Sequence, residues 1–126
     1  MAECTDNILD LIGNTPLLRL GKISGGTVFG KAEFLNPGGS VKDRVARWII
    51  LNAERDGSLE PGAKIVEATS GNTGIGVAFV GRMTCHPVTI VMPEDMSEER
   101  KKIIAALGAE LVLTPKEDGI AGSVRE

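Results

Sequence analysis

One lysine in this chain occupies a position that favours amine chemistry. Lys42 lies in residues 36–44, NPGGSVKDR, where a proline and two glycines form a turn before an apolar helical pattern begins. A helix dipole disfavours positive charge in its first turn, and a neutral amine is a nucleophile that can form a Schiff base with a carbonyl. The neighbouring Asp43 opposes this effect if it lies close. The plain alternative is a solvated lysine at a helix start, which is the usual situation for a lysine.

A second group of polar residues follows at residues 67–76, EATSGNTGIG. Small residues here separate a strand that ends near Thr69 from a helix that begins near Thr73. In an open α/β sheet, ligands bind beyond the carboxyl ends of strands, and the first amides of the next helix favour an anion. Donors from Ser70, Asn72 and Thr73 would complete a cradle for a carboxylate or a phosphate. The equally supported alternative is a tight turn in which Asn72 or Thr73 only caps the helix.

Neither stretch matches a nucleotide-binding motif. The glycines of residues 71–76 are spaced G-x-x-G-x-G rather than G-x-G-x-x-G, and residues 38–43, GGSVKD, do not fit a Walker loop. Cys85 and His86 are adjacent, but a zinc site needs three or four ligands and the sequence supplies no others nearby. We therefore expect no metal site, and free thiols in a reducing cytoplasm.

The composition is that of one globular domain. The chain has 126 residues, 42% of them hydrophobic and 25% charged, with a net charge of −3. Only 3% are aromatic and no basic tract stands out, which argues against nucleic acid and anionic membranes as partners. The amino terminus lacks the pattern of a secretory signal, and no window approaches the ~18 apolar residues of a membrane span.

The elements expected around the two polar stretches alternate between strand and helix. A weak strand is expected at residues 27–35, followed by strands at 64–69, 87–92 and 110–115. An amphipathic helix over 41–55 is marked by Val41, Val45, Trp48 and Ile49. A second helix follows residue 73, and a third is capped by Ser97 and ended by Gly108. This alternation predicts an α/β fold, with a mostly parallel open sheet and helices on both faces.

The carboxyl end lacks a closing element. Residues 116–126, KEDGIAGSVRE, begin what could be a helix, and no return strand follows. A parallel sheet of three or four strands also leaves open edges. We therefore expect a single, incomplete α/β domain over residues 1–126, in preference to a complete domain with a frayed tail.

Five blocks of sequence together resemble the cysteine synthase family (O-acetylserine sulfhydrylases), within the β-replacing enzymes dependent on pyridoxal phosphate. The blocks cover almost the whole chain in the family's order. They are IGNTPLLRL (12–20), KAEFLNPGGSVKDR (31–44), EATSGNTGIGVA (67–78), VMPEDMSEERKKIIAALGAELVLTP (91–115) and GIAGS (119–123). The resemblance implies the smaller amino-terminal domain of a two-domain fold, with residues 1–35 as a strand segment packed on the larger domain and residues 36–126 as a mobile substrate-loop subdomain.

The resemblance also implies roles for individual residues. Lys42 matches the catalytic lysine that forms the Schiff base with pyridoxal phosphate and moves the α-proton. Asn72 matches the asparagine that hydrogen-bonds the 3′-oxygen of the cofactor. The loop Thr69, Ser70, Gly71, Asn72 and Thr73 matches the segment that binds the substrate carboxylate. The family's phosphate-binding loop, and a serine that faces the pyridine nitrogen, belong to the larger domain and have no counterpart here.

The implied reaction replaces the acetate of O-acetylserine with sulfide to give cysteine. The family enzyme is a cytoplasmic homodimer, and serine acetyltransferase is its implied protein partner. Two alternatives stay open. One is a cystathionine β-synthase or an O-phosphoserine-using relative, since these share SVKDR and the asparagine loop. The other, from a different class, is a non-catalytic domain that binds a carboxylate through residues 70–73.

Overall fold

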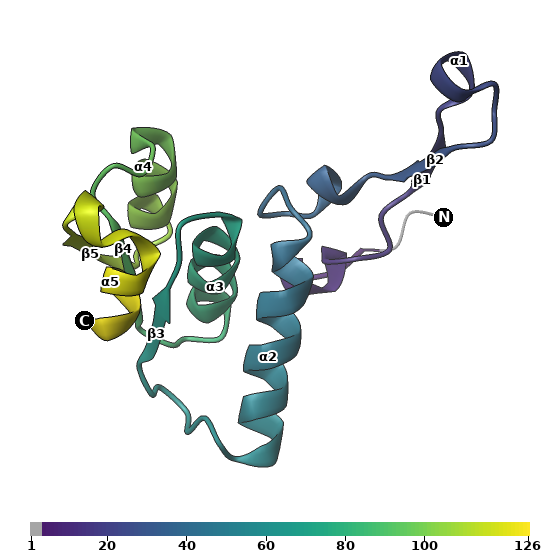
Figure 1. The fold of residues 1–126 in the computed structure, drawn as a ribbon. Helices are drawn as coiled ribbons and strands as arrows, with labels where there is room; N and C mark the ends of the chain where they lie inside the picture. The colour runs from purple at the N-terminus through teal and green to yellow at the C-terminus, as the bar shows by residue number, and fades with distance from the viewer. Residues whose placement is uncertain (1–3) are drawn as a thin grey trace.

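The computed structural model describes residues 4–126, and Figure 1 shows their course. The strands are β1 (Leu17–Arg19), β2 (Phe29–Lys31), β3 (Ile65–Ala68), β4 (Val88–Pro93) and β5 (Glu110–Thr114). The helices are α1 (Gly21–Ser24), α2 (Lys42–Asp56), α3 (Asn72–Met83), α4 (Glu98–Ala106) and α5 (Gly119–Arg125). Within this part of the chain, no helix combines the length and the apolar character that a membrane crossing requires.

The body of the molecule is a parallel sheet in the order β3-β4-β5, covered on both faces. Helices α3 and α4 contact each other and the sheet, while α5 contacts all three strands. On the α5 side, the hydroxyls of Thr114 and Ser123 are 2.8 Å apart. Every residue of β4 is buried, as expected for a central strand with helices on either side. The predicted fold class is confirmed.

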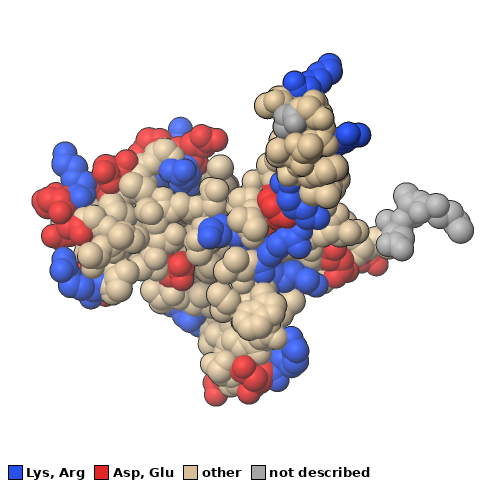
Figure 2. All heavy atoms as spheres, turned by 45° about the vertical axis from the view of Figure 1, so that its right-hand side comes forward, with Lys and Arg blue, Asp and Glu red and all other residues tan. Residues whose placement is uncertain are grey.

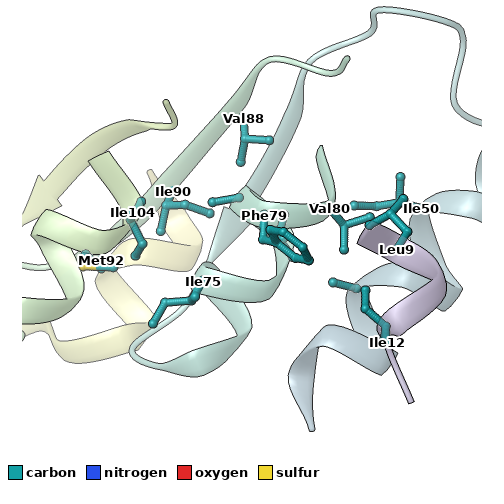
Figure 3. Close-up of a cluster of buried hydrophobic side chains, with 13 residues drawn as sticks. Leu9, Ile12, Ile50, Ile75, Phe79, Val80, Val88, Ile90, Met92 and Ile104 are labelled. Atoms are coloured by element: carbon teal, nitrogen blue, oxygen red, sulfur yellow. The ribbon is translucent and has the colours of Figure 1, made fainter. Parts of the chain in front are cut away.

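The hydrophobic core lies between this sheet and α2, with α3 at its centre (Figure 3). Alternate β4 residues, Val88, Ile90 and Met92, point toward α3 and α4. On the far side of α3, Phe79 and Val80 pack toward Ile50 of α2 and Leu9 near the amino terminus. Because α3 is buried along most of its length, its position relative to both α2 and the sheet is fixed.

Helix α2 forms where the sequence predicts it, but its buried face differs from the apolar face that marked it. The buried positions are Asp43, Ala46 and Ile50. The marker residues Val41, Val45, Trp48 and Ile49 are exposed, Trp48 by 71%. The buried face is the one that packs against α3, where Gly76 allows close approach of the two backbones, and the marker residues lie outside this contact.

The amino-terminal segment forms an arm that projects from the body (Figure 1). Its strands β1 and β2 pair antiparallel, with Leu17 opposite Lys31. The strand predicted over residues 27–35 is therefore shorter than expected, and Glu33–Leu35 forms a single turn of 3-10 helix instead. The carbonyl oxygen of Pro16 accepts one further bond, from the N–H of Ala32 at 3.0 Å, but Pro16 has no N–H to return and the ladder ends there.

Glycines follow two of the helices, and the one after α4, Gly108, is predicted by the sequence. Gly57 follows α2 with φ +80°, and Gly108 follows α4 with φ +85°. Both values lie in the left-handed region that glycine adopts without strain. Ser97 occupies the position before α4, but its side chain makes no capping hydrogen bond. The predicted capping bond is therefore wrong, although Glu98 and Glu99 lie in the first turn, where the helix dipole favours them.

A buried histidine joins the lower part of α2 to the start of β3. The side chain of His86 is fully enclosed, and its Nδ1 lies 2.7 Å from the carbonyl oxygen of Ala63. Its Nε2 lies 3.1 Å from Oε1 of Glu54. Both ring nitrogens thus have polar partners, and His86 acts as a structural link. Among residues 4–126, no cluster of three histidine, cysteine or acidic side chains could hold a metal ion.

Candidate active site

Lys42 is the first residue of α2, at the point where the NPGGSV loop becomes helical. Its backbone N–H donates to Oγ of Ser40 at 3.2 Å, so the loop itself caps the helix start. The side chain is half-buried, and within residues 4–126 its amine has no hydrogen bond or ion pair. An amine held at a fixed backbone position without an internal partner is available to an external group.

The loop from Thr69 to Thr73 connects β3 to α3. Thr69 is buried, its N–H donates to the carbonyl of Val91 at 3.0 Å, and its Oγ1 accepts from the N–H of Gly71 at 3.3 Å. Gly71 takes the position before α3, and no side chain caps this helix. The alternative in which Asn72 or Thr73 is only a helix cap is therefore wrong.

The side chains of Ser70, Asn72 and Thr73 are left available by this arrangement. Ser70 and Asn72 are exposed, and Thr73 is half-buried. None of the three side chains has a hydrogen-bond partner in the part of the chain that the structure describes. Together with the first amides of α3, these donors form a surface that can bind a carboxylate.

The fold brings the starts of α2 and α3 to the same end of the molecule (Figure 1). The two helices approach each other closely at Gly76, where a Cβ atom would lie 3.0 Å from the carbonyl oxygen of Lys42. Gly76 is one helical turn after Asn72, so Lys42 and the Thr69–Thr73 loop border the same region. Residues separated by about thirty positions in the sequence are therefore held together by backbone packing.

An ion-pair network anchors the loop that carries Lys42. Arg44 donates through Nε to Oε2 of Glu33 at 2.8 Å and through Nη2 to Oε1 at 3.0 Å. Thr15 donates to the same carboxylate at 2.8 Å. At the start of the loop, Asn36 donates to Glu33 and accepts the N–H of Gly13 at 2.8 Å. The loop is thus tied to the amino-terminal segment at both of its ends.

Sequence reasoning did not assign a role to these anchoring residues. Asn36 and Arg44 belong to NPGGSVKDR, so the signal was present in the motif. Their partner Glu33 is nearby in sequence, but Thr15 is 29 residues from Arg44, and no spacing rule predicts that pairing. The residue types can be read from the sequence, whereas their hydrogen-bond partners depend on how the amino-terminal segment folds.

The Glu33 network predicts an acid-sensitive stability. Hydrogen bonds from Arg44, and next from Thr15, lower the pKa of Glu33 from 4.5 to about 2. Because the folded pKa is depressed, this stabilisation is present above pH 4.5 and is lost as the pH falls toward 2. We expect the free energy of unfolding in urea to fall between pH 5 and pH 3 by more in the parent chain than in Glu33→Gln. Equal pH dependence in the two proteins would contradict the assignment.

A cavity of about 440 Å³ lies beside the candidate loop. It is lined by Asn72 and Ile75 of α3 and by four residues around the start of α4, namely Ser97, Glu99, Arg100 and Ile103. A larger cavity of about 640 Å³ includes His86 and Gly108, at the opposite ends of the strands. We favour the smaller cavity, because ligands of parallel sheets bind at the carboxyl ends of the strands.

Comparison with known proteins identifies the family. Residues 8–126 match the family model described as pyridoxal-phosphate dependent enzyme. A cysteine synthase from Staphylococcus aureus is 48% identical over 124 residues, which are 96% of this chain and 40% of that protein. An O-acetylserine dependent cystathionine beta-synthase from Bacillus subtilis is 44% identical, over 100% of this chain and 42% of that protein.

The solved structures agree with the sequence matches. The crystal structure of a cysteine synthase from Entamoeba histolytica superposes with a TM-score of 0.92 at 42% identity, covering 98% of this chain and 38% of that one. The chain thus spans about 40% of the length of the relatives it matches. The resemblance predicted from the five sequence blocks is confirmed, and the chain belongs to the family of pyridoxal-phosphate-dependent enzymes.

Proposed function

We propose that this chain carries the lysine and the carboxylate-binding loop of a cysteine synthase. The reaction is β-elimination of acetate from O-acetyl-L-serine, followed by addition of sulfide to give L-cysteine. The observation that carries the proposal is the amine of Lys42, which has no hydrogen bond or ion pair within residues 4–126. The backbone of Lys42 packs against Gly76, beside a loop whose side chains Ser70, Asn72 and Thr73 also have no hydrogen-bond partner among those residues. The cysteine synthases among its relatives support the choice of reaction.

The residues present carry the chemical groups that pyridoxal phosphate requires. Lys42 supplies a primary amine for the carbonyl of the cofactor, and Asn72 supplies an amide that can donate to its 3′-oxygen. When bound, the cofactor withdraws electrons from the α-carbon of the attached amino acid. Lys42 Nζ would take the α-proton, while Thr69, Ser70, Gly71, Asn72 and Thr73 would hold and orient the carboxylate.

We also propose how this segment fits into a larger enzyme. Residues 1–35 would pack on a larger domain, and residues 36–126 would form the mobile substrate-loop subdomain. The projecting arm supports this arrangement, because it exposes Ile23 by 85% and Phe29 by 54% and is largely uncharged below its basic tip (Figure 2). A homodimer, a serine acetyltransferase partner and a cytoplasmic location belong to the same proposal. The free, exposed thiols of Cys4 and Cys85 suit a reducing compartment.

The second substrate has one specific alternative. The Bacillus subtilis relative is named as an O-acetylserine dependent cystathionine beta-synthase, so a thiol such as homocysteine is a second candidate nucleophile. Assays of the whole enzyme with O-acetylserine and either sulfide or homocysteine would separate the two. Faster product formation with sulfide is expected. Binding of O-acetylserine without any bound cofactor would instead support the non-catalytic domain.

Replacement of Asn72 by alanine tests the ligand-binding role of the loop. Its side chain is exposed and caps nothing, so we expect the melting temperature to be unchanged. Loss of one ligand hydrogen bond of about 1.5–3 kcal/mol should weaken O-acetylserine binding by roughly 10- to 100-fold. Asn52→Ala, at a half-buried position toward the carboxyl end of α2, removes the same amide away from the loop and is the control that should bind normally. A drop in stability with unchanged binding would make Asn72 structural instead.

A further inference from the structure

A fully buried carboxyl group lies directly beside Lys42, and the reaction described above does not use it. Asp43 has 0% of its surface exposed, although it is in the first turn of α2. Buried carboxyl groups are rare in proteins unless they are paired or hydrogen-bonded. Within residues 4–126, no lysine, arginine or histidine forms an ion pair with Asp43. Its retention in the interior therefore requires another explanation.

The contacts of Asp43 point to the preceding loop. Its Oδ2 accepts the N–H of Gly38 at 2.5 Å, across the turn that leads into α2. Gly38 lies so close to this carboxyl that a Cβ atom on it would overlap Oδ1. The backbone of Asp43 also borders α3, because a Cβ on Gly76 would lie 3.4 Å from its N atom. The loop, Asp43 and α3 are therefore packed directly against one another.

The electrostatics of the site suit a neutral carboxyl group. Oδ1 has no hydrogen-bond partner in the part of the chain that the structure covers. Burial raises the pKa of Asp43, and the hydrogen bond from Gly38 lowers it by less. A protonated carboxyl group still has a carbonyl oxygen that accepts the N–H of Gly38, and it avoids the free-energy cost of burying a charge. An asparagine has the same shape and the same acceptor, which provides a direct test.

We propose that Asp43 is a positioning residue for Lys42, because its buried carboxyl accepts the Gly38 N–H and so fixes the loop that leads into α2. The hydrogen bond fixes the turn at residues 38–40, and Ser40 in turn caps the N–H of Lys42. The value of this placement for chemistry rests on the proposed role of Lys42. The loop contact itself does not depend on that role, so the two can be tested separately.

The test compares Asp43→Ala and Asp43→Asn with the parent chain. Amide hydrogen exchange at Gly38 and the backbone NMR signals of Lys42 report the conformation of the loop. The amount of pyridoxal phosphate trapped on Lys42 by borohydride reports how readily the amine reacts with the cofactor. Removal of one buried hydrogen bond should speed Gly38 exchange by about 10-fold in Asp43→Ala and shift the Lys42 signals. Trapping of the cofactor on Lys42 should fall in Asp43→Ala. In Asp43→Asn, Gly38 should exchange within about 3-fold of the parent rate and trapping should return to the parent level.

Asp56→Ala is the matched control. Asp56 accepts the N–H of Ser58 at 3.0 Å at the other end of α2. The substitution therefore also removes a bond between a carboxyl group and a backbone N–H, but at an exposed position far from Lys42. Gly38 exchange should stay at the parent rate in this variant. Unchanged Gly38 exchange in a folded Asp43→Ala protein would overturn the proposal. If that variant does not fold, Gly38 exchange in Asp43→Asn as fast as in an unprotected amide would overturn it.

The same experiment distinguishes failure of the inference from failure of the proposed function. If the parent chain is not labelled at Lys42, the role of the lysine is wrong, whereas the Gly38 and Lys42 backbone signals still decide the positioning contact. If Lys42 is labelled equally in the parent and in a folded Asp43→Ala protein, the lysine role stands and the positioning role is refuted.

Discussion

Replacement of Lys42 by alanine is expected to abolish covalent capture of pyridoxal phosphate. Lys42 places a half-buried amine, unpaired among residues 4–126, at the start of α2 beside the loop that would hold the substrate carboxylate. A methyl group in its place cannot bond to the carbonyl of the cofactor, so the visible absorbance of the bound cofactor should disappear completely. Because the amine has no hydrogen bond or ion pair within residues 4–126, the free energy of unfolding should change by less than about 0.5 kcal/mol.

The control for this prediction is Lys64→Ala. Lys64 is an exposed lysine whose Nζ lies 2.9 Å from Oε2 of Glu110, near the opposite ends of the strands. Surface pairs of this kind contribute little to stability, so the variant should fold and bind the cofactor as the parent does. Equal loss of absorbance in both variants would indicate non-specific reaction with surface amines. Full absorbance in Lys42→Ala would show that another lysine holds the cofactor.

Replacement of Gly76 by valine is expected to displace Lys42 without removing any polar group. A Cβ at this position would lie 3.0 Å from the carbonyl oxygen of Lys42 and 3.1 Å from its carbonyl carbon. Backbone atoms cannot rotate out of the way, so α2 must move away from α3 at this end. Overpacking of this kind costs about 1–3 kcal/mol, and cofactor trapping on Lys42 should fall with it. Gly76→Ala should show the same effects to a smaller degree.

Gly74→Ala serves as the control for the valine variant. Its Cβ would meet a methyl group of Thr69 at 2.8 Å and side chains of Ile90 and Ile104, so the strain falls on side chains. We expect it to disturb the carboxylate loop while the backbone NMR signals of Lys42 stay in place. If Gly76→Val is as stable as the parent and leaves trapping on Lys42 unchanged, the close approach of α2 and α3 does not position the lysine.

The order of strands and helices was predictable because each element carries a local signal. The nearly continuous apolar run of β4 requires cover on both faces, and the structure provides it. The outer face of α2 was not predictable in the same way. Periodicity identifies an apolar stripe but not its partner. The face of α2 that packs on α3 is the one that meets Gly76, where the absence of a side chain allows the two backbones to approach closely.

The candidate site also combines features that local sequence predicts with features that depend on tertiary packing. Lys42 and the Thr69–Thr73 loop were located from the sequence, because turns that enter helices have distinctive residue types. Their closeness in space depends on the packing of Gly76 against the backbone of Lys42, which no local pattern encodes. The same holds for Asp43, whose burial is visible only once the Gly38 turn folds over it. Local sequence patterns thus identify candidate groups, and tertiary packing determines how these groups are arranged.

The measurement that tests the account most directly is peptide mapping of the protein after reaction with pyridoxal phosphate and reduction with borohydride. Reduction fixes the cofactor to the amine that holds it, and mass spectrometry then identifies the modified lysine. The account predicts that the added mass is found on the peptide that contains Lys42. Modification of a different lysine, or modification spread evenly over the surface lysines, would contradict it.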